Sequence, residues 1–225
     1  MGVPPDQYPE VRERWRRTIE AVQLHLQVTL QDRSIWREVR DALIGREPDA
    51  FLASYTRTYV ASTAIALRRI ADVKADAKRT HSLGALISAI SRQPGVISRD
   101  TWDPHRRPVD GRPGAEESMR RILAQNFDDA FGDGEGGLDQ ALLHADLDSL
   151  TVGATKISAF ADRMVAHIDK RGMEDLPTFD DLDEAFALLE SMVKRYYLLV
   201  TGSSLVQVEP VMQFDWKAAL RTSIF

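Results

Sequence analysis

The amino-acid sequence predicts an all-α protein, a bundle of long antiparallel helices followed by an extended C-terminal tail. Apolar residues recur at steps of three and four over most of the chain, which places them on one face of a helix. The 225 residues are 44% hydrophobic, which is enough to bury a full core. We therefore expect a single helical domain over residues 1–225.

The chain is expected to begin with a loose arm at residues 1–9, followed by helices over residues 10–99. The apolar stripe of the first helix consists of Val11, Trp15, Ile19, Val22 and Leu26. A polar break at Gln31–Ser34 interrupts the stripe, and the pattern then resumes with Ile35 and Trp36. The break predicts two consecutive helices in this part of the chain.

Two more helices are expected before the middle of the chain. Gly45 and Pro48 end the preceding helix, and Asp49 is placed to cap the next one. Ser82 opens a short helix. Residues 100–114 combine three prolines with glycines and charges, and they are expected to form a long loop, a class of segment that is often functional.

A second group of helices is expected over residues 115–201. The glycine-rich stretch at 132–137 lacks the Lys-Ser/Thr ending of a phosphate-binding loop, so it is interpreted as a connector. Thr178 followed by Asp181 predicts a capping box at the start of the last long helix. Residues 202–225 contain short β-type stretches and are expected to wrap over the bundle as a tail.

Composition excludes several classes of protein. Cysteine is absent, which removes disulfides, thiolate zinc sites and cysteine nucleophiles and suits a reducing cytoplasm. The longest apolar candidate, at residues 59–67, is far shorter than the roughly 20 residues that span a bilayer. The net charge of -5 argues against a protein that binds nucleic acid over its whole surface. Any nucleic-acid-binding surface is therefore expected to be a local basic patch. We expect a cytoplasmic protein without membrane contact, cofactor or metal.

One helix carries the main chemical hypothesis. At about 100° per residue, Lys156, Arg163, His167 and Lys170 fall on one face beside the apolar stripe. An imidazole near an arginine can stay neutral and act as a base. In metal-free RNA cleavage a base removes the 2′-hydroxyl proton and a cation stabilises the charge on the phosphoryl oxygens. The alternative is structural, with His167 satisfying a buried hydrogen bond and the cations lying in solvent.

Four stretches of this sequence resemble one known family. They are ALRRIAD at 66–72, HSLGALI at 81–87, ADRMVAHID at 161–169 and PTFDDLDEAF at 177–186. Together they resemble the abortive-infection (AbiU-type) branch of the HEPN helical superfamily. The resemblance implies a helical bundle, frequent homodimers, links to phage defence or toxin–antitoxin systems, and often metal-independent RNase activity.

The same resemblance implies catalytic residues. The pattern of the superfamily is an arginine, a polar residue, several variable positions and a histidine. In this chain the spacing is shorter, with three residues between Arg163 and His167, and Asp162 stands where the shortest regular spacing would put the arginine. A helix still presents an i, i+4 pair on one side. The candidates for catalysis are therefore His167 and Arg163. Asp162 is expected to support them, either by holding the imidazole or by pairing with neighbours of Arg163.

Arg68 and Arg69 form a second group of candidate site residues. Arg69 lies at the margin of the apolar stripe of its helix, where it is expected either to pair with Asp72 or to add a cation beside His167. Arg68 points away from that stripe. Together with Lys156 and Lys170, Arg69 is the candidate for substrate binding.

Three other groups of residues are weaker candidates for a functional site, and each has a simpler structural explanation. His144 with Asp146 could touch a metal, but a helix-end pair is the simpler interpretation. The acidic run at 180–184 suits a first helical turn. The loop residues Arg106, Arg107 and Trp102 could touch RNA, or could lie in solvent.

Two hypotheses of function follow. In the first, the protein is a defence effector that binds or cleaves RNA, a homodimer with a cognate protein partner. In the second, it is a non-catalytic helical module that binds another protein, and the same polar residues are structural.

Overall fold

The computed structural model confirms the all-α class. It describes residues 4–45, 49–74, 80–102, 115–165, 176–210, 215 and 217–218. In these residues the α-helices are α1 (Tyr8–Leu43), α2 (Asp49–Ala71), α3 (Leu83–Arg92), α4 (Ala115–Phe131), α5 (Gln140–Phe160) and α6 (Phe179–Thr201). Short 3-10 turns lie at Pro5–Gln7 and Pro94–Val96. No strand occurs in the described part of the chain, which has only an isolated bridge between Gly132 and Leu138.

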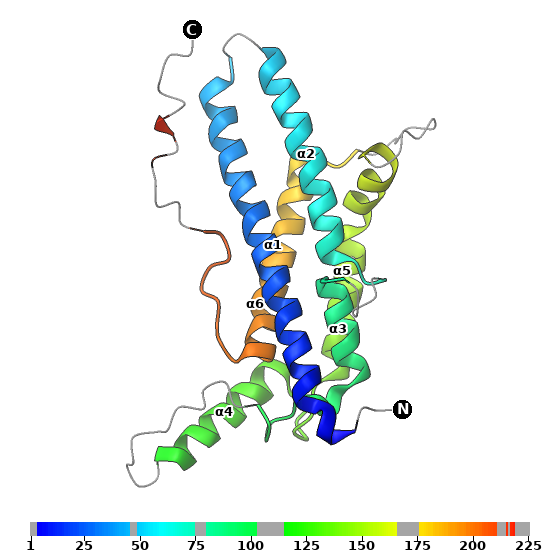
Figure 1. Cartoon of the computed structure of the whole chain (residues 1–225), viewed down its shortest axis with the longest axis vertical. Helices are drawn as coiled ribbons and strands as arrows, with labels where there is room; N and C mark the ends of the chain where they lie inside the picture. The colour runs from blue at the N-terminus through cyan, green and yellow to red at the C-terminus, as the bar shows by residue number, and fades with distance from the viewer. Residues whose placement is uncertain are drawn as a thin grey trace.

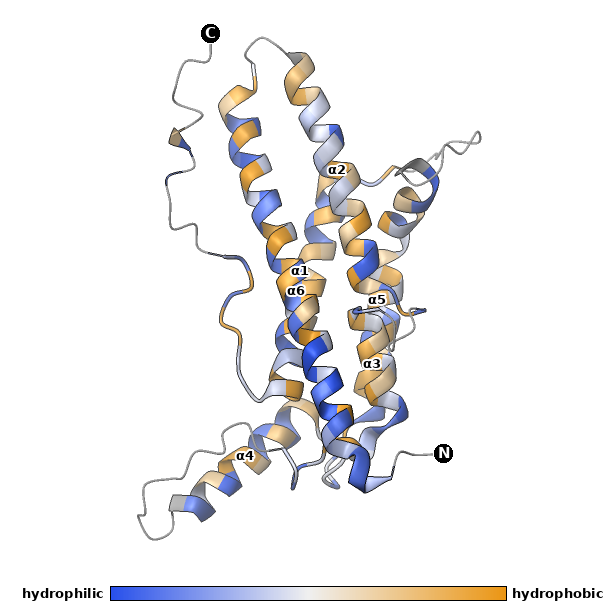
Figure 2. Cartoon of the chain, in the orientation of Figure 1, coloured by the Kyte–Doolittle hydropathy of each residue, from blue (hydrophilic) through white to orange (hydrophobic). Residues whose placement is uncertain are grey.

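Four long helices form the body of the protein (Figure 1). α1 packs on α2 and α6, and α5 packs on the same two helices from the other side. α3 fills the space between α1 and α5 below α2. The hydropathy colouring shows apolar stripes along these helices (Figure 2). Side chains from all of them, including Ile19, Leu67, Ile87, Leu150 and Val193, belong to one buried apolar cluster.

α1 is a single helix, so the prediction of a break at Gln31–Ser34 is wrong. This stretch contains no glycine or proline, and its polar side chains interrupt the apolar stripe without interrupting the backbone. Arg33 explains one of these polar positions, because it forms an ion pair with Asp183 of α6 at 2.6 Å. The helix also starts earlier than expected, at Tyr8 within the predicted loose arm.

The predicted helix boundaries at Ser82, Thr178 and Gly202 are confirmed. The Ser82 hydroxyl accepts a hydrogen bond from the backbone N–H of Ala85 and caps α3. Thr178 and Asp181 form the reciprocal capping box of α6. Gly202 follows α6 with φ of 71°, a left-handed conformation that glycine adopts without strain.

α4 lies at one end of the bundle and points away from it (Figure 1). Its C-terminal half is held by Phe127 and Phe131, whose rings lie 5.8 Å and 6.0 Å from that of Trp102. The indole N–H of Trp102 donates to the backbone carbonyl of Leu199 in α6, at 3.1 Å. Trp102, expected in a basic loop that could contact RNA, is therefore a buried anchor for α4.

The chain turns back along the bundle after α6 (Figure 1). Val208 is buried, and the ammonium of Lys217 lies 2.7 Å from the carboxylate of Glu38 in α1. The aromatic anchors predicted for this tail, Phe214 and Trp216, lie outside the described residues. No helix in the described part of the chain is both long and apolar enough to cross a membrane.

Candidate functional site

The candidate site lies at the C-terminal end of α5. This helix begins at Gln140, where the Asp139 carboxylate accepts hydrogen bonds from the backbone N–H groups of Ala141 and Leu142. Beyond Phe160 the backbone changes to a π-helical turn at Ala161–Val165. Such turns are rare and frequently occur at functional sites. The uniform 100° per residue assumed from the sequence therefore fails within the predicted catalytic segment.

The π turn is tied to α2 by an ion pair. The Nε of Arg68 lies 2.8 Å from Oδ1 of Asp162, and both side chains are about half exposed. The sequence predicts a supporting role for Asp162, and it predicts that Arg69, not Arg68, is the α2 arginine near His167. Arg68, rather than Arg69, is therefore the α2 arginine that contacts this turn.

The predicted catalytic pair is only partly described. Arg163 is exposed and directly follows Asp162 on the π turn. His167 and Lys170 lie outside the described residues. The catalytic assignment of Arg163 and His167 therefore stays a prediction.

Lys156 contacts a different neighbour. Its ammonium lies 3.0 Å from Oδ2 of Asp181, the acidic residue of the α6 capping box. Hydrogen bonds from the Thr178 backbone N–H and hydroxyl, and then from Lys156, lower the pKa of Asp181 to about 2. Lys156 thus binds α6 while Asp162 binds α2, so these two residues of the predicted site face different helices.

A shallow groove of about 290 Å³ lies between the C-terminal end of α2 and α5. Asp162 and Arg68 form part of its wall, and Lys74 lies on the α2 side. The α5 side contributes the hydroxyl-bearing residues Thr151, Thr155 and Ser158. The Thr151 and Thr155 hydroxyls donate to backbone carbonyls one turn earlier in α5. The cations Arg68 and Lys74 suit a ligand with phosphate oxygens, although Asp72 and Asp162 offset their charge.

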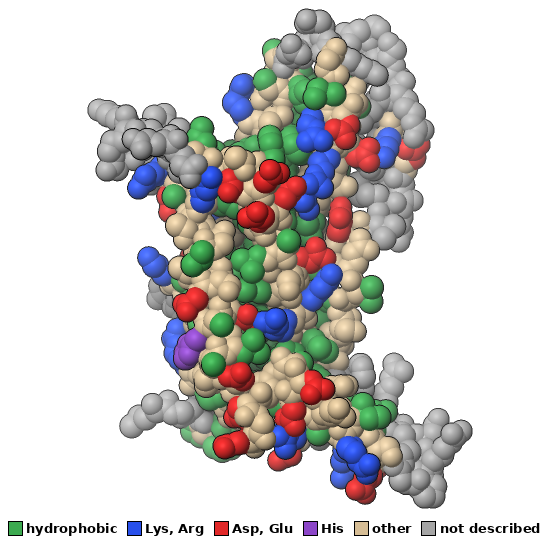
Figure 3. Space-filling model, turned by 180° about the vertical axis from the view of Figure 1, so that it is seen from behind, with side chains coloured by type: hydrophobic (Ala, Val, Ile, Leu, Met, Phe, Trp, Pro, Cys, Tyr) green, Lys and Arg blue, Asp and Glu red, His purple; other side chains and the backbone are tan. Residues whose placement is uncertain are grey.

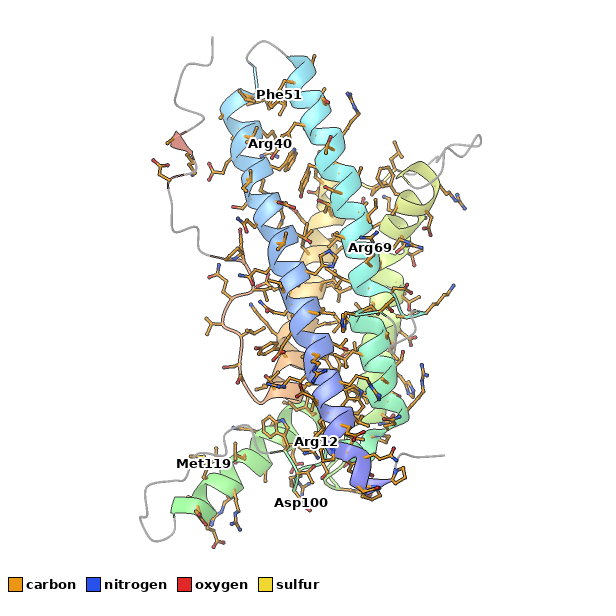
Figure 4. All side chains as sticks on the ribbon, in the orientation of Figure 1. Arg12, Arg40, Phe51, Arg69, Asp100 and Met119 are labelled. Atoms are coloured by element: carbon orange, nitrogen blue, oxygen red, sulfur yellow. The ribbon has the colours of Figure 1, made fainter. Side chains whose placement is uncertain are left out.

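Arg69 lies toward α1. Burial lowers the pKa of the His25 imidazole, and the nearby positive charge of Arg69 lowers it further. Figure 4 labels Arg69 on α2. The carboxylate of Asp72, its expected ion-pair partner, accepts a hydrogen bond from the backbone N–H of Lys74. A substrate-binding role for Arg69 stays a prediction.

The Asp146 carboxylate of α5 is buried, and sequence reasoning missed its partners. One guanidinium nitrogen of Arg195 in α6 donates to both carboxylate oxygens of Asp146 at 2.7 Å, and the Tyr196 hydroxyl donates to Oδ2 at 2.9 Å. His144 is exposed and lies 3.4 Å from the Ser91 hydroxyl. Asp146 is therefore a structural ion-pair partner and not half of a His144 metal site.

In the described residues, no group of three His, Asp or Glu side chains is arranged to hold a metal ion. The basic residues of the expected RNA-contacting loop, including Arg106 and Arg107, lie outside the described part of the chain. On the face seen from behind, acidic and basic side chains are interspersed over most of the described surface, apart from a short column of basic side chains toward the upper right (Figure 3).

The four-helix body and the polar π turn define a helical-bundle protein with one candidate polar site. The chain belongs to the HEPN_AbiU2 family, described as AbiU2, whose model matches residues 17–219. The resemblance to the abortive-infection branch of the HEPN superfamily is thus confirmed. No curated protein and no solved structure matches the chain.

Proposed function

We propose that the protein is an abortive-infection effector that cleaves RNA without a metal ion. Membership of the HEPN_AbiU2 family supports the defence role. The observation that carries the RNA proposal is the Arg68–Asp162 ion pair. It holds the π turn that bears Arg163 against the wall of a polar groove, and the same wall includes the cation Lys74.

The proposed reaction uses the RNA strand as its own nucleophile. The imidazole of His167 removes the proton of a 2′-hydroxyl, and the 2′-oxygen attacks the adjacent phosphorus. The bond from phosphorus to the 5′-oxygen breaks, and that oxygen takes up a proton as it leaves. The products are a 2′,3′-cyclic phosphate and a 5′-hydroxyl. Arg163 stabilises the negative charge that grows on the phosphoryl oxygens.

Other residues have positioning or binding roles in this proposal. Arg68 and Asp162 hold the π turn in place and so act as positioning residues. Lys170 and Arg69 bind phosphates along the strand. Lys156 contributes less, because its ammonium is already paired with Asp181.

The test is an RNA cleavage assay with purified protein in the presence of EDTA. We expect cleavage, cyclic phosphate ends, and no reaction on a strand whose nucleosides are all 2′-deoxy. His167→Ala should lower the rate at least about 100-fold, the effect typical of removing a general base. His144→Ala replaces an exposed histidine of α5 that contacts Ser91, and it should leave the rate unchanged. Equal rates for the two variants would remove His167 from the mechanism.

A non-catalytic protein-binding module is the second candidate function. The observation that favours it is the pairing of Arg68 with Asp162 and of Lys156 with Asp181, which leaves these charges serving the fold. In that case wild-type protein does not cleave RNA under any condition of the assay. The same purified protein would instead capture a partner protein, and Arg163→Ala would weaken that capture.

A further inference from the structure

A depression of about 400 Å³ lies beside the N-terminal end of α1, at the end of the bundle from which α4 projects (Figure 1). Its walls include Pro5, Tyr8 and Pro9 from the beginning of the chain and Val200 near the end of α6. Tyr8 and Val200 pack against the buried apolar core, so this part of the wall is preformed. The volume lies within the range of small-molecule sites, roughly 300–1,000 Å³.

Arg12 lines this depression and forms no ion pair within the described residues (Figure 4 labels it on α1). Its guanidinium donates to backbone carbonyls instead. The Nε and one terminal nitrogen donate to the carbonyl of Val96, the Nε at 2.8 Å, and the other terminal nitrogen donates to that of Thr101 at 3.3 Å. A guanidinium has five N–H donors, so two are left for a further acceptor. Burial lowers the pKa of Arg12, as expected for a cation held without an opposite charge.

Arg16 lies one turn further along α1 and lines the same depression. It pairs with Glu13 at 2.8 Å, and Glu13 also pairs with Arg17 at 2.9 Å. Two cations and one carboxylate therefore line the depression, which gives it an excess of one positive charge. The groove beside the π turn has no such excess, because two aspartates balance its two cations.

We propose that this depression binds a small molecule that carries an oxyanion, a phosphate or a carboxylate, on an aromatic or apolar body. Arg12 and Arg16 donate to the oxyanion, whose geometry planar guanidinium groups match well. The apolar body packs on Tyr8, Pro9 and Val200. This inference goes beyond the proposed function and does not depend on it, since the π turn lies toward the other end of the bundle (Figure 1).

Arg16 is the position at which the proposal can be tested without disturbing the fold. Arg12 is less suitable, because its bonds to Val96 and Thr101 tie α1 to the segment before α4. The side chain of Arg16 is 51% exposed, and surface ion pairs of this kind add little to stability. Arg17 supplies the matched control. It pairs with the same carboxylate as Arg16, is 72% exposed, and does not line the depression.

The test is an NMR titration of the ¹⁵N-labelled protein with phenyl phosphate, benzoate and inorganic phosphate, at low ionic strength in a buffer without oxyanions. We expect the Nε–H signals of Arg12 and Arg16 to shift with a Kd of about 0.1 to 1 mM for the tighter organic probe. Inorganic phosphate, which has no apolar body, should bind at least about tenfold more weakly. The tighter of the two organic probes identifies the oxyanion that the site prefers.

Arg16→Gln should raise the Kd for that probe at least about tenfold, because a charge-assisted hydrogen bond to the oxyanion is lost. Arg17→Gln lowers the net charge of the protein by the same one unit, and it should leave the Kd within about twofold of the wild-type value. The thermal midpoints of the two variants without ligand should agree, which separates binding from stability.

Two results would overturn the proposal. The first is the absence of any shift at about 10 mM of either organic probe, a concentration well above the expected Kd. The second is an equal loss of affinity in Arg16→Gln and Arg17→Gln, which would mean that the probe is attracted to a basic surface and not held in the depression.

Discussion

Two aspartates, one on α5 and one on the π turn that follows it, each pair with an arginine from a neighbouring helix, and the two pairs differ in their surroundings. Asp146, near the start of the helix, pairs with Arg195, and its side chain is 9% exposed. Asp162, on the π turn at the end, pairs with Arg68, and its side chain is 51% exposed. The buried carboxylate accepts a further hydrogen bond from the Tyr196 hydroxyl.

An aspartate–arginine ion pair therefore affects the stability of the fold differently at these two positions. A buried carboxylate must keep its partner, because an unpaired charge in the interior is strongly unfavourable. An exposed pair adds little to stability, because water and salt screen it. Asp146 fixes the packing of α5 on α6, whereas Asp162 and Arg68 can lose their contact and leave the fold intact. An exposed pair of this kind can serve a site that binds a ligand.

Arg195→Met should give the largest change. It leaves the Asp146 carboxylate buried with only the Tyr196 hydroxyl as partner. We expect the free energy of unfolding to fall by about 3 kcal/mol, the lower end of the range for broken buried pairs, because Arg195 itself is partly exposed. Urea denaturation at pH 7 measures this loss. A change below about 1 kcal/mol would mean that Asp146 behaves as a surface group.

Tyr196→Phe should have an intermediate effect. At pH 7 the loss of its hydrogen bond to Asp146 should lower the free energy of unfolding by about 1.5 kcal/mol. Burial first, and then the charge of Asp146, raise the pKa of Tyr196 above its ordinary value. A raised pKa in the folded state means that stability is complete below about pH 10 and falls at higher pH.

The phenylalanine variant should lose stability less steeply above that pH than the wild type does. Urea titrations at a series of alkaline pH values compare the two slopes. Equal slopes would show that Tyr196 ionises as it does in the unfolded chain.

Thr178→Ala should lower the free energy of unfolding by about 1 kcal/mol, the usual effect of removing a helix cap. It also removes one of the hydrogen bonds that lower the pKa of Asp181 to about 2 from 3.8. A lowered pKa in the folded state gives stability that is present above about pH 4 and is lost as pH falls toward about 2.

The alanine variant should therefore show a smaller acid-induced loss than the wild type over that range. Asp181→Asn removes the titrating group, so it should show the smallest acid-induced loss of stability of the three proteins. If Thr178→Ala loses as much stability in acid as the wild type does, the Thr178 hydroxyl does not contribute to the lowered pKa of Asp181.

Arg68→Met should have the smallest effect on stability, less than about 1 kcal/mol, although the substitution is the same as at Arg195. Its effect on RNA cleavage should be larger, at least about tenfold, because the π turn loses its tie to α2. Urea denaturation and the EDTA cleavage assay on the same preparation give both values. Unchanged cleavage would exclude Arg68 as a positioning residue.

Local signals in the sequence predicted most of the helices. Caps at Ser82 and Thr178 and the glycine at 202 act over a few neighbouring residues, so they can be recognised without knowing the tertiary structure. The break expected at Gln31–Ser34 failed because polarity alone does not end a helix. A polar residue occupies position 33 because Arg33 forms an ion pair with Asp183, which is far away in the sequence.

The candidate site was less predictable for the same reason. The partners Asp146 and Arg195, or Arg68 and Asp162, are joined only when their helices pack, and no pattern in one chain shows which face meets which. The π turn also changes the direction of side chains after Ala161. The helical geometry assumed from the sequence therefore could not tell Arg68 from Arg69.

The most direct test of the central claim is the rate at which wild-type protein and Arg163→Ala cleave a labelled RNA in EDTA. The account predicts cleavage by the wild type and a rate at least about 100-fold lower for the variant, with an unchanged thermal midpoint. Wild-type protein that leaves the RNA intact, or an Arg163→Ala variant that cleaves it at the wild-type rate, would contradict the account.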